Sequence, residues 1–214
     1  MKSIFIQSTV WRKVFVGLTG LGLAFFVLIH MLGNLLLFIG EESYNMYSHR
    51  LISNPLTLLL EMGLIVIFSI HILWALALAV YNRNKKGSSA EKDSNSLIHK
   101  TLWIQGIIIL TFVVLHLITF KFGTYYTTIY NGQEVRDLFR LVNEVFQKPL
   151  YVAWYLFSLL ILFFHLNHGL QASLRSLGFY HQPFIQKTGL IYSLIVTIGF
   201  MAQPLYFLGG FVGI

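Results

Sequence analysis

Five long runs of apolar residues, separated by polar segments, dominate the pattern of hydrophobic and polar positions along the chain. A helix that crosses a membrane needs about 20 mostly apolar residues, and every run reaches that length. Strands of a membrane barrel would be about 10 residues long and would alternate in polarity, which these runs do not. The pattern therefore predicts an all-α integral membrane bundle that forms one domain over residues 1–214. Its five helices are expected at about residues 11–39, 56–81, 97–120, 150–174 and 187–212.

One polar segment has a helical period of its own. Within residues 137–148, apolar residues recur at Leu138, Leu141, Val142 and Val145. This spacing predicts a short amphipathic helix that lies near the membrane surface.

The composition supports a membrane protein. Hydrophobic residues make up 56% of the chain and charged residues 11%, and the mean hydropathy is +0.70. Soluble domains carry about a quarter charged residues, so this chain has too little charge to cover a soluble surface. A soluble domain and a disordered chain are both excluded.

The net charge of +7 lies at the ends of the apolar runs and forms no stripe with interleaved aromatic residues, so nucleic-acid binding is not expected. With five helices, the N-terminus, the segment 82–100 and the segment between the last two helices share one side. That side carries 10 of the 15 basic residues, and the other side carries most of the acids. By the positive-inside rule, the N-terminus is cytoplasmic and the C-terminus is outside.

Histidines inside the apolar runs are the candidates for chemistry, because ionisable groups in a membrane are costly and usually functional. One histidine in a membrane helix is more often a hydrogen-bonded structural residue than a metal ligand. Here the first three helices each carry one, and the fourth carries two. The five are His30, His71, His116, His165 and His168.

These histidines share two depths. His30 and His116 each lie 19 residues after the start of their runs, which is about 28 Å along a helix, towards the outer side. His71 and His165 each lie 10 residues before the cytoplasmic end of their helices, or about 15 Å. The spacing therefore predicts an outer pair and an inner pair.

Two pairs of imidazoles at two depths favour two b-type haems, since a haem iron takes axial ligands from opposite faces. Zinc would need its ligands to meet at one height. The chain has no cysteine, which excludes c-type haem attachment, thiolate metal sites and an iron–sulfur cluster of its own. His168 is the alternative to His165 as the fourth ligand. Gly33 and Gly169, one turn from histidines, suit either the approach of a flat macrocycle or helix packing.

Three ordered motifs carry a family resemblance. They are His30-Met-Leu-Gly-Asn34, then Tyr44-Asn-Met-Tyr-Ser48 leading to Asn54-Pro55-Leu56, and Phe164-His-Leu-Asn-His-Gly-Leu170 followed by Ser173 and Leu177-Gly178. With the five-helix plan, the chain resembles the dihaem cytochrome b membrane subunit of bacterial succinate:menaquinone oxidoreductases and fumarate reductases, in its single-polypeptide form.

The resemblance implies two haems b, a menaquinone site, and a flavoprotein subunit and an iron–sulfur subunit docked on the cytoplasmic face of a bacterial inner membrane. The family's fourth ligand begins a His-x-x-x-Gly pattern, which here is His165 to Gly169. Some members carry a proton-transferring glutamate two residues before this ligand. Phe163 stands there, so the sequence gives no support to that proton route.

The sequence gives only a weak signal for the quinone site. Glu61, the one acid inside an apolar run, lies near the level of the outer haem and is a candidate proton group for a quinone, or else an interfacial residue favoured by the helix dipole. His49, Arg50 and Asn54 are vaguer candidates for the quinone or the outer propionates. Arg12 and Arg175 would pair with inner-haem propionates, or simply snorkel to the interface.

Two rival functions remain open. A dihaem cytochrome b subunit of a hydrogenase or formate dehydrogenase would share the histidines and differ in its partners. A proton-coupled transporter would use the histidines as a relay and bind no haem.

Overall fold

The computed structural model describes residues 9–85 and 95–210. Within these residues, five helices are long and apolar enough to cross a membrane, as the apolar runs predict. They are α2 (Thr9–Asn34), α4 (Pro55–Lys85), α5 (Asn95–His116), α7 (Pro149–Ser176) and α8 (Gln182–Leu208).

Several helix ends differ from the expected ones, and at the start of the last helix local capping is the reason. The last helix begins at Gln182 and not at Lys187, because the His181 side chain accepts a hydrogen bond from Phe184 N and Pro183 occupies the first turn. The helix expected over 56–81 runs on to Lys85. The first helix tightens into a 3₁₀ turn, η1 (Leu35–Phe38), and α5 continues as a π-helical turn, η2 (Leu117–Lys121).

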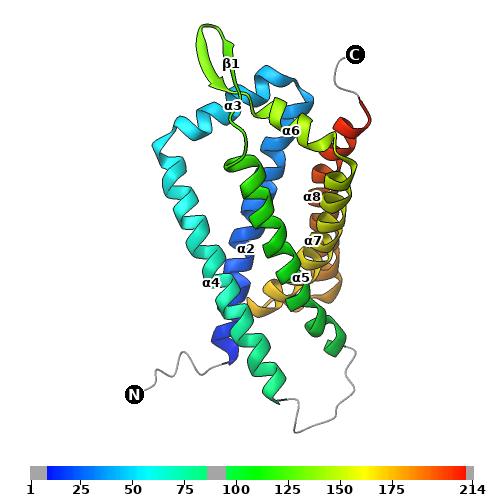
Figure 1. Ribbon diagram of the computed structural model, residues 1–214. Helices are drawn as coiled ribbons and strands as arrows, with labels where there is room; N and C mark the ends of the chain where they lie inside the picture. The colour runs from blue at the N-terminus through cyan, green and yellow to red at the C-terminus, as the bar shows by residue number, and fades with distance from the viewer. Residues whose placement is uncertain (1–8, 86–94, 211–214) are drawn as a thin grey trace.

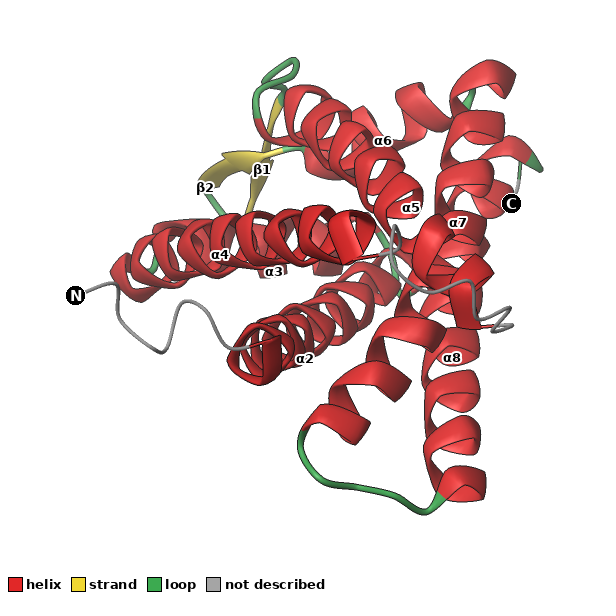
Figure 2. Cartoon of the chain, turned by 90° about the horizontal axis from the view of Figure 1, so that it is seen from below, coloured by secondary structure: helices red, strands yellow, loops and turns green. Residues whose placement is uncertain are grey.

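The long helices pack into a bundle (Figures 1 and 2). α7 lies beside α8, α2 and α5, while α2 also lies beside α4. Apolar side chains on the outside of α4, such as Leu58, Leu59 and Leu60, are about two-thirds exposed. So much exposed apolar surface is unfavourable in water and suits the hydrocarbon of a membrane.

A small cap closes one end of the bundle (top of Figure 1). The predicted amphipathic helix is confirmed as α6 (Leu138–Phe146), which buries Leu141, Val142 and Val145. The sequence reading did not predict the rest of the cap, which is α3 (Glu41–Ser53) and the antiparallel hairpin of β1 (Thr127–Tyr130) and β2 (Gln133–Arg136). The largest hydrophobic core of the described residues lies here, between the cap and the ends of α7 and α8.

Candidate functional site

The rings of His30 on α2 and His116 on α5 lie face to edge near the cap, with centroids 5.8 Å apart and planes at 89°. We call them the cap-end pair. Phe26 stacks on His30 at 5.5 Å. Tyr155 on α7 places its Oη 3.1 Å from His116 Nδ1, which leaves Nε2 as the other nitrogen available to a ligand.

The rings of His71 on α4 and His165 on α7 form a second pair, with centroids 6.5 Å apart and planes at 79°. We call them the mid-bundle pair. Thr19 Oγ1 on α2 lies 3.1 Å from His71 Nδ1. The buried Nδ1 of His165 has no hydrogen-bond partner among the described residues.

The two pairs lie at different heights in the bundle. A Cβ built on Gly20 would lie 3.3 Å from His71 Cε1, so the mid-bundle pair is level with Gly20 on α2. His30 comes ten residues later on the same helix, which is about 15 Å along the axis. The structure thus brings together the residues that the sequence spacing paired, at two levels.

The separation of the ring centroids in each pair is close to that of two imidazoles bound to one metal ion. With metal–nitrogen bonds of about 2.0 Å, the ring centroids would lie about 6 Å apart. No group of three or more His, Cys, Asp or Glu side chains gathers as an ion site in residues 9–85 and 95–210. A porphyrin brings four nitrogens of its own, so two imidazoles are what a b-type haem needs. The residues present fit haem, and ligation itself stays a prediction.

His165, and not His168, stands opposite His71. The Nδ1 of His168 is buried and has no partner among the described residues. Because His168 lies three residues further along α7, its side chain is turned about 60° around the helix from that of His165.

The two arginines suggested as propionate partners have protein contacts. The Arg12 guanidinium lies over the ring of Tyr81, 5.2 Å from its centroid. Arg175 donates from Nη2 to Gln171 Oε1 at 2.9 Å, and Gln171 packs against Gly189 of α8. Arg175 is thereby directed along the α8 side of α7. Neither contact tests a role at a haem.

The two glycines singled out in the sequence have different surroundings. A Cβ on Gly33 would lie 2.7 Å from Tyr47 Oη, so this glycine makes room for α3. A Cβ on Gly169 would meet no atom of the described residues within 4 Å. Helix packing therefore explains Gly33, and the macrocycle interpretation stays a prediction for Gly169 alone.

Glu61 forms an ion pair with Lys121, with Oε2 and Nζ 2.6 Å apart and both side chains 43% exposed. This contact joins α4 to the π-helical turn that follows His116. The sequence reading named Glu61 without its partner, and the proton role at a quinone stays a prediction.

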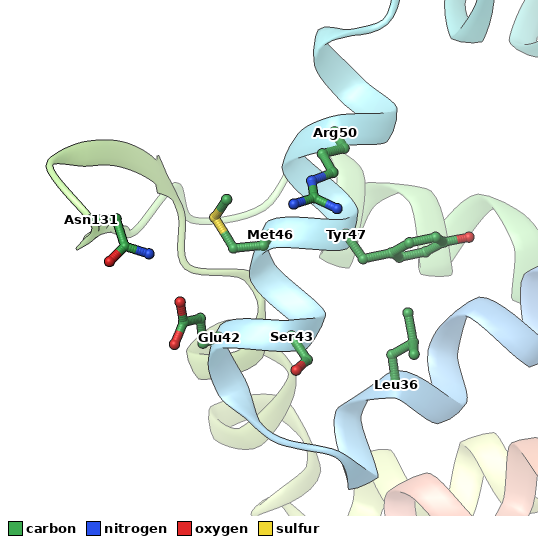
Figure 3. Close-up of a pocket in the computed structure, with 7 residues that line it drawn as sticks. All are labelled: Leu36, Glu42, Ser43, Met46, Tyr47, Arg50 and Asn131. Carbon is green, nitrogen blue, oxygen red and sulfur yellow. The ribbon is translucent and has the colours of Figure 1, made fainter.

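The three weaker candidates between the first two long helices, His49, Arg50 and Asn54, have different surroundings. Asn54 Oδ1 accepts a hydrogen bond from Leu56 N at the start of α4, and the His49 ring bonds the side chain of Gln133. Arg50 lines an open hollow of about 440 Å³ between α3, η1 and the hairpin tip (Figure 3). It shares this hollow with Leu36, Glu42, Ser43, Met46, Tyr47 and Asn131.

A buried polar network ties the cap to the cap-end pair. Asn45, which is fully buried, donates to Asp137 Oδ1 and accepts from Phe139 N, both at 2.9 Å. Its neighbour Tyr44 donates to Asn34 Oδ1 at 3.0 Å, and Asn34 Nδ2 donates to the His30 carbonyl at 2.8 Å. Burial raises the pKa of Tyr44 above its usual value, so its hydroxyl remains a neutral donor.

Arg136 fixes the far side of the cap. Its Nη2 donates to the Phe120 carbonyl at 2.8 Å, in the π-helical turn after His116, and its guanidinium lies over the Tyr125 ring. π-helical turns often occur at functional sites. The cap thus contacts the chain directly beyond both histidines of the cap-end pair.

The sequence reading missed Thr19 and Tyr155, which hold ring nitrogens of His71 and His116. Thr19 is 52 residues from its histidine and Tyr155 is 39 residues from its own. A polar side chain one helix away leaves no local signal in sequence. The signal that could have found them is a hydroxyl side chain on a neighbouring helix at the expected depth of each histidine pair.

Comparison with known protein families, with curated proteins and with solved structures finds no match to this chain. The family resemblance therefore rests on the motifs and their placement.

Proposed function

We propose that the chain is the membrane-anchor and electron-transfer subunit of a respiratory complex, a dihaem cytochrome b. In this proposal it carries electrons between menaquinone and a cytoplasmic flavoprotein and iron–sulfur pair that performs succinate or fumarate chemistry. His30 and His116 bind the outer haem, and His71 and His165 bind the inner haem.

One observation carries the proposal: two pairs of imidazole rings, with centroids 5.8 and 6.5 Å apart, lie at levels about 15 Å apart along α2, inside a bundle of apolar helices. Each pair supplies two ligands from two different helices. Bound haem b supplies a one-electron ferric–ferrous couple at each level. The chain's part is to hold the imidazoles, to orient two of them through Thr19 and Tyr155, and to surround them with apolar side chains.

The orientation and the partners in this proposal rest on the sequence alone. A cytoplasmic N-terminus puts the cap outside and puts most basic residues on the side where the soluble subunits would dock. The succinate-type partners rest on the three motifs. Two of these motifs are in contact, since Tyr44 bonds Asn34 and Tyr47 packs on Gly33. Because these two motifs pack against each other, their residues can be expected to occur together.

The first test is the reduced-minus-oxidised spectrum and haem content of the purified chain. We expect two b haems per chain, one of which is lost in His30→Leu and the other in His71→Leu. His181→Leu is a matched control, because His181 is an exposed histidine at the start of α8 and should leave both haems in place. A purified chain without a haem spectrum would refute the proposal and favour the transporter.

The second test identifies the partners. Membranes that contain the assembled complex are given succinate, formate or hydrogen, and haem reduction is followed by absorbance. Reduction by succinate alone, reversed by fumarate, is expected. Reduction by hydrogen or formate would instead identify the rival dihaem subunit.

A further inference from the structure

The single hydroxyl proton of Thr19 is already hydrogen-bonded to the backbone. Thr19 Oγ1 lies 2.7 Å from the Phe15 carbonyl oxygen and 3.2 Å from that of Val16. A carbonyl oxygen only accepts hydrogen bonds, so the hydroxyl proton points to these oxygens. Towards His71 the oxygen then presents a lone pair.

This arrangement fixes the tautomer of His71. The contact of 3.1 Å between Thr19 Oγ1 and His71 Nδ1 is a hydrogen bond only if Nδ1 carries the proton. A neutral imidazole has one N–H, so Nε2 keeps a free lone pair. The nitrogen that can bind iron is therefore the one turned away from Thr19.

Gly20 makes room for the ring of His71. A Cβ there would lie 3.3 Å from His71 Cε1 and 3.6 Å from Ser173 Oγ of α7, so a larger residue would press on both. Thr19 and Gly20 together let α2, which supplies no ligand to the mid-bundle pair, set the position of a ligand on α4.

We propose that Thr19 is a positioning residue for the inner haem: by accepting the Nδ1–H of His71 it fixes the ring and leaves Nε2 for the iron. The inference rests on the proposed function. Partners of this kind orient a metal-bound histidine and raise its basicity. A more basic ligand favours ferric iron and lowers the midpoint potential.

Thr19→Val removes the hydroxyl acceptor and keeps the shape of the side chain, while the backbone carbonyl of Val16, which also accepts a hydrogen bond from His71, stays in place. The ferrous-to-ferric ratio of the inner haem should rise about three- to tenfold at a given potential, which for one electron is about 30–60 mV. Thr19→Ser keeps the oxygen and should restore the wild-type potential. Thr111→Val is the matched control, because Thr111 Oγ1 makes the same bond to the carbonyl four residues before it, at 3.0 Å, on an exposed face of α5.

The measurement is a potentiometric titration of the two haem bands, with the inner band identified by its loss in His71→Leu. A raised inner potential in Thr19→Val, with the outer potential unchanged, supports the proposal. Loss of the inner haem in Thr19→Val but not in Thr19→Ser also supports it. An unchanged potential in Thr19→Val, or loss of haem in both variants, overturns it. A wild-type chain without haem would instead refute the proposed function.

Discussion

The buried amide of Asn45 should be the most sensitive point of the cap. Asn45→Ala removes a donor to the Asp137 carboxylate and the acceptor for Phe139 N–H, both in a fully buried setting. A hydrogen bond to a charged group contributes about 1.5–3 kcal/mol, and a buried N–H without a partner costs about 1–3 kcal/mol. We therefore expect the free energy of opening the cap to fall by about 3–4 kcal/mol.

Hydrogen exchange with mass spectrometry measures this opening directly in the folded protein. At 1.4 kcal/mol per factor of ten, amide exchange over residues 127–146 should accelerate about 100- to 1000-fold. The midsections of α7 and α8 should exchange as in the wild type, because they pack on one another away from the cap.

Asn143→Ala is the matched control on α6. Among the described residues its side chain accepts one exposed hydrogen bond, from Gln147 at 3.2 Å, so exchange should change by less than about tenfold. If Asn45→Ala also changes exchange by less than tenfold, the network does not hold the cap and the reasoning is wrong.

Three further predictions concern packing, the cap-end pair and pH. Gly189→Ala should lower the melting temperature in detergent by several degrees, because the added Cβ would lie 2.8 Å from a side chain of α7. Gly63→Ala is the control and should not lower it, because a Cβ at Gly63 would meet no described atom within 4 Å. Tyr155→Phe should raise the potential of the outer haem in a redox titration and leave the inner one unchanged, since it removes the hydroxyl that faces the cap-end histidine. The pKa of Glu144 is lowered from 4.5 by a hydrogen bond from Tyr126 and, to a smaller extent, by one from Arg140. Above pH 4.5, wild type should therefore melt at a higher temperature than Glu144→Gln, and this difference should vanish as the pH falls through the lowered pKa.

The five long helices were predictable because hydrocarbon leaves little choice. A backbone in a membrane must satisfy its own hydrogen bonds, so a run of about 20 apolar residues forms a helix. The ends were less predictable, because capping decides them. The last helix was expected to begin at about Lys187, but Pro183 and the His181 cap begin α8 five residues earlier.

The cap was largely missed because the segments between the spans are short, polar and without a long apolar run. One signal was present: Asn131-Gly132 sits between two strands with φ of 52° and 79°, as the two central residues of a tight hairpin turn require. The start of α3 also carries Glu41 and Glu42 in its first turn, which favours a helix.

The pairing of histidines was predictable from depth, because the rise per residue of a helix is fixed. What depth does not give is the rotation of each helix about its axis. That rotation brings Thr19 to His71 and Tyr155 to His116, and it depends on packing across the whole bundle. The ion pair of Glu61 with Lys121 was missed for the same reason.

The interleaving of the histidine pairs also sets an order of biogenesis for the proposed cytochrome. The cap-end pair joins the first and third long helices, and the mid-bundle pair joins the second and fourth. His116 leaves the ribosome 49 residues before His165, which at about 5–20 residues per second is a few seconds. In the proposed cytochrome the outer site would thus be complete first, while His71 is in the membrane before its partner His165 has been made. Haem loading during synthesis would therefore begin at the outer site, and a chain stalled before α7 would carry one haem and not two.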